Sequence, residues 1–170
     1  MKLISKTIAI GIAATFAIDC WTFIISYFGV KTRGILFLGR WLTYLPKGKF
    51  FHQTIIQTPS IENEVVIGRI AHYSIGIAFA FLLIGIYGKK WFDKPKLLHA
   101  LVFGIITLVI PVFFLQPALG FGIAFSNTHK PVSLLINIVI IHSIYGLGLY
   151  IATSTINSFN NDFFKIKKSH

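Results

Sequence analysis

The sequence is poor in charge, has a single cysteine and lacks the common signatures of enzymes. Only 12% of its 170 residues are charged, whereas soluble domains carry about 25%. With Cys20 as the sole cysteine, an intramolecular disulfide is excluded. No nucleotide-binding loop, nucleophile motif or pair of cysteine ligands occurs. An enzyme, for example one acting on a lipid, is therefore the less favoured interpretation, although the sequence leaves it open.

Apolar residues make up 55% of the chain and gather in runs long enough for the ~20 residues that a bilayer-spanning helix needs. We therefore predict an all-α fold, an integral membrane four-helix bundle. The first run is too long for a signal peptide core and is interpreted as an uncleaved span. The expected organisation is one domain over 1–156, with spans near 7–30, 65–87, 97–119 and 132–156, followed by a basic, disordered cytoplasmic tail at 157–170.

An apolar and aromatic segment at about 34–45 is too short to span. Trp41 and Tyr44 suit a helix lying at the level of the lipid headgroups. This interfacial segment is either a lid over the mouth of the bundle or an anchor only. Arg40 and His52 are the candidate residues of an outer mouth beside it.

The net charge of +11 is carried by lysines and arginines that flank the apolar runs. There they meet lipid headgroups and set the topology, and no basic stripe interleaved with aromatics indicates a nucleic-acid partner. The lipid bilayer is the expected partner, and a homo-oligomer is compatible with the sequence. Four spans place both termini on the side with more lysines and arginines, which predicts cytoplasmic termini.

One polar stretch begins the second apolar run. Gly68, His72, Gly76 and Ala80 are four residues apart, so on a helix they share one face. A titratable side chain within a membrane-length segment is costly to expose to lipid, so His72 is expected to face protein. Arg69, one turn into the span, is expected to snorkel outward.

Polar residues of the other spans fall at a similar depth. With a rise of about 1.5 Å per residue, Asp19, His72 and His142 lie roughly 12–16 Å from the ends of their spans opposite the termini. Gln116 is shallower on the same side. The sequence therefore predicts an intramembrane polar cluster of Asp19, His72, Gln116 and His142.

Three interpretations of this cluster stay open. It is a structural core that fixes the register of the helices, or a path for protons or a small solute, for which Asp and His are the usual relay residues. Alternatively, His72 and His142 bind haem or a metal ion, with Gly76 and Gly146 making room for a porphyrin. The first two interpretations need no cofactor.

Two features of the third run complete the expectations. Pro111 removes a backbone hydrogen bond, so a kink is predicted there. The apolar piece around Gly120 and Gly122, up to Phe125, is either the tilted end of this span or a short re-entrant cap.

Several short motifs, in their order and spacing, resemble a known family over about residues 8–153. They are Gly11-Ile-Ala-Ala-Thr with Asp19-Cys-Trp21, Gly39-Arg-Trp-Leu42, Pro46-Lys-Gly48 with His52, His72-Tyr-Ser-Ile-Gly76, Gln116-Pro-Ala-Leu-Gly-Phe-Gly122, and His142 with Gly146-Leu-Gly-Leu-Tyr150. This set is similar to domain of unknown function 2938, a bacterial family of small four-span membrane proteins.

The resemblance implies the four-span fold and a location in the bacterial inner (cytoplasmic) membrane, and it implies no reaction, substrate or cofactor. The chain departs from the family pattern at His129-Lys130-Pro131, where a more proline-rich turn is usual, and at Arg69, where tryptophan is common. Neither departure is expected to touch the polar cluster.

Overall fold

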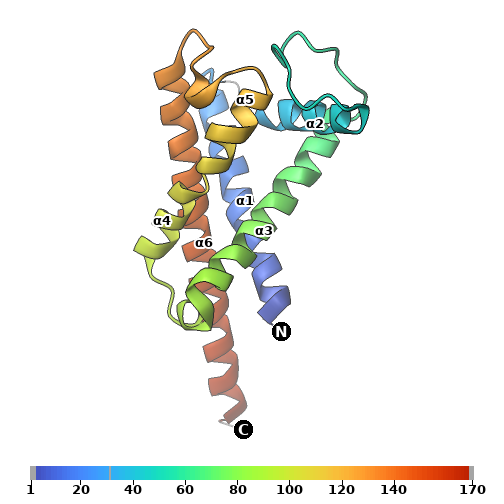
Figure 1. The fold of residues 1–170 in the computed structure, drawn as a ribbon. Helices are drawn as coiled ribbons and strands as arrows, with labels where there is room; N and C mark the ends of the chain where they lie inside the picture. The colour runs from blue at the N-terminus through green and yellow to red at the C-terminus, as the bar shows by residue number, and fades with distance from the viewer. Residues whose placement is uncertain (1–2, 31, 169–170) are drawn as a thin grey trace.

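The computed structural model describes residues 3–30 and 32–168, and within these ranges the regular structure is helical, with no strand. The helices are α1 (Leu3–Tyr27), α2 (Gly34–Tyr44), α3 (Glu64–Asp93), α4 (Leu97–Ile106), α5 (Gln116–Ala118) and α6 (Pro131–Lys168) (Figure 1). Short 3₁₀ turns follow at Leu45–Lys47 and Ile123–Phe125, and a π-helical turn covers Pro111–Leu115.

Four helical stretches are long and apolar enough to cross a membrane: Leu3–Tyr27, Glu64–Asp93, Leu97–Ala118 and Pro131–Ser158. The predicted all-α membrane fold is thus confirmed. Both ends of the chain lie at the same end of the bundle, which we call the terminal side, and α2 lies across the opposite end, the α2 side (Figure 1). The short helix α2 coincides with the predicted interfacial segment.

Two helix ends are compared with expectation, and one of them differs. Helix α6 continues to Lys168, so the part of the expected disordered tail that the structure describes is helical. The reason is local: no proline or glycine occurs from Asn157 to Lys168, and the Asn157 amide donates a hydrogen bond to the Phe92 carbonyl, which ties the helix to α3. In α3, Gly88 has a left-handed φ of 71°, so regular helix ends close to the predicted residue 87.

Glycines set the contacts between helices. A Cβ on Gly68 would lie 1.9 Å from the Ile35 carbonyl oxygen of α2, and one on Gly76 would lie 1.9 Å from the Thr15 hydroxyl oxygen of α1. Small residues let helix backbones approach closely, which is how helices associate in a membrane. On α3, Gly68 therefore allows close packing of α2, and Gly76, two turns further along, allows close packing of α1.

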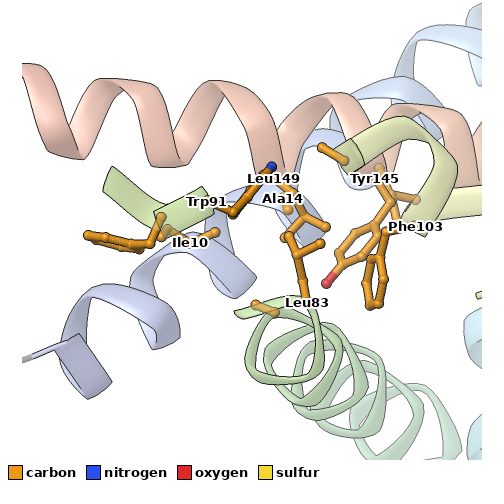
Figure 2. Packing of buried hydrophobic residues seen from close by; sticks show 11 residues of the cluster. Ile10, Ala14, Leu83, Trp91, Phe103, Tyr145 and Leu149 are labelled. Atoms are coloured by element: carbon orange, nitrogen blue, oxygen red, sulfur yellow. The ribbon is translucent and has the colours of Figure 1, made fainter. Parts of the chain in front are cut away.

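The buried apolar core occupies the terminal side of the bundle. It is formed by the second half of α3, the middle of α6, residues 10–18 of α1, and α4. Figure 2 shows its side chains interdigitating between these helices, among them Ile10, Ala14, Leu83, Phe103 and Leu149. Leu83, Ala14 and Leu149 are fully buried, so this half of the bundle is closed by apolar packing.

The third span is broken, as Pro111 predicts. The α-helix ends at Ile106, and from Pro111 the chain forms a π-helical turn in which the Gln116 N–H reaches back to the Pro111 carbonyl. A proline cannot donate a helix hydrogen bond, and π turns inside helices often occur at functional sites. This break places the third span's side chains along one wall of the site described below.

The piece after α5 is a folded cap rather than a tilted helix end. Gly120 and Gly122 have left-handed φ values of 87° and 72°, which turn the chain back on itself. The loop between α2 and α3 packs on this cap, because the His52 and Ile55 N–H groups donate to carbonyls of the α5 end. Thus two segments far apart in the sequence cover the α2 side together.

Candidate functional site

A partly open cavity of about 170 Å³ lies between α3 and the π-helical turn. Side chains from α1, α2, α3, the π-helical turn and α6 line it, and most of them are apolar. The polar ones are Thr15, His72, His142 and Tyr145. We call this space the histidine cavity, because His72 and His142 bring the two imidazoles of the predicted cluster to it from different helices.

A threonine of the third span orients His142. The Thr107 hydroxyl lies 2.6 Å from the Gly104 carbonyl oxygen and 2.7 Å from Nδ1 of His142. Since the hydroxyl proton is donated to the carbonyl, the imidazole donates its Nδ1–H to the threonine oxygen. This assignment leaves Nε2 of His142 as a lone-pair acceptor.

Asp19 lies beside His72, at the edge of the cavity. Its Oδ1 is 3.9 Å from Nε2 of His72, which is too long for a hydrogen bond, and that buried nitrogen has no partner in the part of the chain that the structure describes. Its Oδ2 accepts hydrogen bonds from the Tyr73 hydroxyl at 2.8 Å and from Arg69 at 2.9 Å. The carboxylate is therefore anchored on one oxygen, and the other faces the histidine.

Arg69 requires a correction. Its side chain is 53% exposed, as expected for an outward-pointing arginine, but it forms an ion pair with Asp19. The expectation that this family departure does not touch the polar cluster is wrong. The physical reason is that Arg69 and Tyr73 are four residues apart on α3, so both reach the face that packs on α1.

Gln116 is set apart from the two histidines. It is buried at the start of α5, and its Oε1 has no hydrogen-bond partner among the described residues. Its neighbour Leu115 lines the histidine cavity, but Gln116 does not. Of the four predicted cluster residues, the structure thus brings Asp19, His72 and His142 together and leaves Gln116 aside.

Arg40 and His52 also lie outside the cavity lining. Arg40 is buried and pairs with Glu64 through two hydrogen bonds, of 2.8 Å from Nε and 2.7 Å from Nη2. Its Nη1 donates to the carbonyls of Ile55 and Thr58 in the loop between α2 and α3. We call Arg40, Glu64 and these two carbonyls the Arg40 clamp. It fixes α2 so that Leu38 lines the cavity, which favours a covering role for α2.

His52 belongs to the same loop. Its Nδ1 is 2.9 Å from the Thr58 hydroxyl oxygen, whose proton goes to the Thr54 carbonyl, so the imidazole is the donor. Its Nε2 is buried and has no hydrogen-bond partner within residues 3–30 and 32–168. Burial, and to a lesser extent the charge of Lys49, lower the pKa of His52, so the folded loop favours the neutral ring.

This lowered pKa makes the loop sensitive to acid. A group with a lowered pKa takes up its proton later in the folded state, so stability is complete above the unfolded value of about 6.5 and falls as the pH drops below it. We expect the amide protons of His52 and Ile55, which bond to α5 carbonyls, to lose protection from hydrogen exchange between about pH 7.5 and about pH 5. His52→Gln should remove this pH-dependent loss of protection. The control His129→Gln, at an exposed histidine, should leave the loss unchanged. An unchanged pH response in His52→Gln would contradict the assignment.

Sequence reasoning missed four residues of these networks: Tyr73, Thr107, Glu64 and the role of Arg69. A signal existed for two of them. Tyr73 and Arg69 are spaced for one helix face next to His72. The sequence held no signal for Thr107 or Glu64. The partner of Thr107 depends on the packing of α4 on α6, and that of Glu64 on the packing of α2 on α3.

The cofactor alternative can be compared with the space around the histidines. The space beside Gly76 is filled by Thr15 and that beside Gly146 by the backbone of Ala100, so neighbouring helices occupy the room that a porphyrin would need. Within residues 3–30 and 32–168, no group of three or more His, Cys, Asp or Glu side chains is arranged to hold a metal ion. The residues present do not fit a haem between the two imidazoles.

Fold and composition together define a helical membrane protein with a cavity inside its membrane-length helices. The chain belongs to the family described as protein of unknown function (DUF2938), whose model matches residues 8–156. No curated protein and no solved structure matches the chain.

Proposed function

We propose that this protein is a multi-pass transport protein of the bacterial inner membrane that moves protons, alone or with a small solute, through the histidine cavity. The observation that carries the proposal is that His72 and His142, from different helices, face one cavity. Nε2 of His72 has no partner among the described residues, and Nε2 of His142 is a lone-pair acceptor. Ionisable groups are costly at this depth and commonly mark ion or substrate paths. The excess of lysine and arginine on the terminal side supports cytoplasmic termini.

Asp19 supports a proton relay rather than an isolated pair of histidines. One carboxylate oxygen is held by Arg69 and Tyr73, and the other lies 3.9 Å from His72. A small rotation of the imidazole, or one bridging water, brings these groups into hydrogen-bond distance. Asp19 is therefore suited to exchange protons with His72 at the edge of the cavity.

The cavity ends at the buried apolar core, so passage requires a second conformation. Tyr145 donates a 2.6 Å hydrogen bond to the Gly76 carbonyl directly below the histidines, and fully buried leucines follow. The π-helical turn is the element suited to move, because its backbone already departs from the regular α-helical hydrogen-bond pattern. On this proposal, the structure represents a state that is closed on the terminal side and covered by Leu38 of α2 on the α2 side.

Proton flux into liposomes tests the proposal. Protein reconstituted with a pH-sensitive dye inside should dissipate a pH gradient, and His72→Gln, His142→Gln and Asp19→Asn should each slow this by about tenfold or more, as the loss of a positioned proton-transfer group does. Asp93→Asn is the matched control. Asp93 forms an exposed ion pair with Lys89 at the other end of α3, so the flux should not change.

Thermal unfolding of the same proteins separates transport from a purely structural cluster. If the wild type gives no flux above empty liposomes, with or without a solute gradient, while His142→Gln only lowers the Tm, the cluster is a structural core and the proposal fails. Equal flux in wild type and Asp19→Asn would remove Asp19 from the path.

A further inference from the structure

We infer that the solute of the histidine cavity is a small lipophilic molecule with one hydrogen-bond donor, of which a phenol is the simplest example, and that it enters from the bilayer. This inference rests on the proposed function, because it names the class of solute for that same site. It depends on three observations: the size and apolar lining of the cavity, the acceptor nitrogen in its wall, and the direction in which it opens.

The size of the cavity suits one ring. Its volume is about 170 Å³, and apolar cavities of about 150 Å³ in protein interiors stay dry and bind benzene. The walls are mainly aliphatic and aromatic, and they include Ile18, Ile75, Phe79 and Ile141. A strongly hydrated ion or sugar would lose more hydrogen bonds to water than this lining can replace.

The polar side chains in the cavity wall favour a ligand that donates a hydrogen bond. Because Nδ1 of His142 gives its proton to Thr107, Nε2 carries the lone pair and accepts a hydrogen bond. The Tyr145 hydroxyl already donates to the Gly76 carbonyl, and the Thr15 hydroxyl to the Gly11 carbonyl. The protons of these two hydroxyls are thus already donated, so a ligand hydroxyl can satisfy His142. The other ring in the wall, His72, has an Nε2 without a partner among the described residues.

The cavity opens sideways, toward the lipid. Ile75 of α3 and Ile110, next to the π-helical turn, both line the cavity and are 41% and 51% exposed. These apolar side chains therefore stand at the rim and also on the outer surface of the bundle. The other two directions are covered, by Leu38 of α2 and by the aromatic contact of Phe79 with Phe103, 6.5 Å between ring centroids.

Fluorine NMR tests the class of ligand. Purified full-length protein in phosphatidylglycerol nanodiscs is titrated with 4-fluorophenol, and in parallel with fluorobenzene, which has the same ring but no hydroxyl. We expect a saturable shift for 4-fluorophenol beyond that of empty nanodiscs, and binding of fluorobenzene weaker by about tenfold, the value of one buried hydrogen bond. His142→Leu should remove the preference for the phenol.

A pair of neighbouring tryptophan variants tests the route. Ile110→Trp should block the lateral opening and slow or abolish the uptake of 4-fluorophenol. Val109→Trp is the control, since Val109 is 49% exposed on the same segment but does not line the cavity. Both substitutions lie on the exposed surface of the bundle, so neither is expected to impair folding.

Each outcome is decisive. Equal binding of the two probes, no saturable binding, or equal uptake by the Ile110→Trp and Val109→Trp variants would overturn this inference. If 4-fluorophenol fails to bind while proton flux depends on His72 and His142, the ligand class is wrong and the proposed function stands. If 4-fluorophenol binds as expected but no flux occurs, transport is overturned and the cavity is a ligand-binding site.

Discussion

Replacing Arg40 with alanine is expected to lower the free energy of unfolding by about 3–5 kcal/mol, the usual cost of removing one partner of a buried ion pair. The change leaves the buried Glu64 carboxylate with one donor from the described residues, the Ile61 N–H. It also removes the donor to the Ile55 and Thr58 carbonyls, which hold the loop between α2 and α3. Arg40→Lys should rescue little, because an ammonium cannot pair with Glu64 through two bonds and reach both carbonyls.

Thermal unfolding followed by circular dichroism in detergent measures this effect. A loss of this size corresponds to a fall in Tm of about 6–20 °C for a chain of this length. Arg33→Ala is the control, because Arg33 is exposed before α2 and should leave the Tm unchanged. Arg40→Leu combined with Glu64→Leu should be less destabilising than Arg40→Ala, since no unpaired charge remains. A Tm of Arg40→Ala equal to that of the wild type would show that the Arg40 clamp does not hold the fold.

The second large effect is expected from Gly68→Ala. A Cβ at this position would lie 1.9 Å from the Ile35 carbonyl oxygen and 3.0 Å from the Gly39 nitrogen, both backbone atoms of α2. Backbone cannot swing aside as a long side chain can, so α2 must move away from α3. We expect the upper part of the 1–3 kcal/mol that overpacking typically costs, or more.

Gly85→Ala on the same helix is the matched control. A Cβ on Gly85 meets nothing within 4 Å, so the same substitution should change stability little. Hydrogen exchange should show whether the damage is local: in Gly68→Ala, amides of α2 should lose protection more than those of the buried apolar core. Equal Tm values for the two variants would mean that α2 does not pack on α3 as closely as described.

These two contacts bear on the site as well as on stability. The Arg40 clamp and Gly68 together hold α2 against the first turns of α3, and this position places Leu38 over the histidine cavity. His72 lies one turn beyond Gly68 on the same face. A variant that loosens this corner should therefore also change access to the cavity from the α2 side.

The sequence by itself determined the helices and their approximate ends. Span length follows from the thickness of a bilayer, and apolar runs of that length leave few alternatives. It also predicted that His72 faces protein, and the structure agrees, because Gly68, Gly76 and Ala80 on that face are buried. The composition after residue 156 predicted a disordered tail, whereas the structure describes helix as far as Lys168, because a lysine-rich composition does not by itself break a helix.

Only the tertiary structure decided which polar residues meet. Counting residues gives the depth of a side chain along its helix, but not the direction in which it points around the axis. Those directions are fixed by close contacts such as Gly76 on Thr15, which no pattern in one helix reveals. For this reason the sequence could place Asp19 and His142 at the same depth in the membrane as His72, but it could not predict their partners Arg69 and Thr107. Gln116 has a suitable depth and yet lies outside the cavity lining.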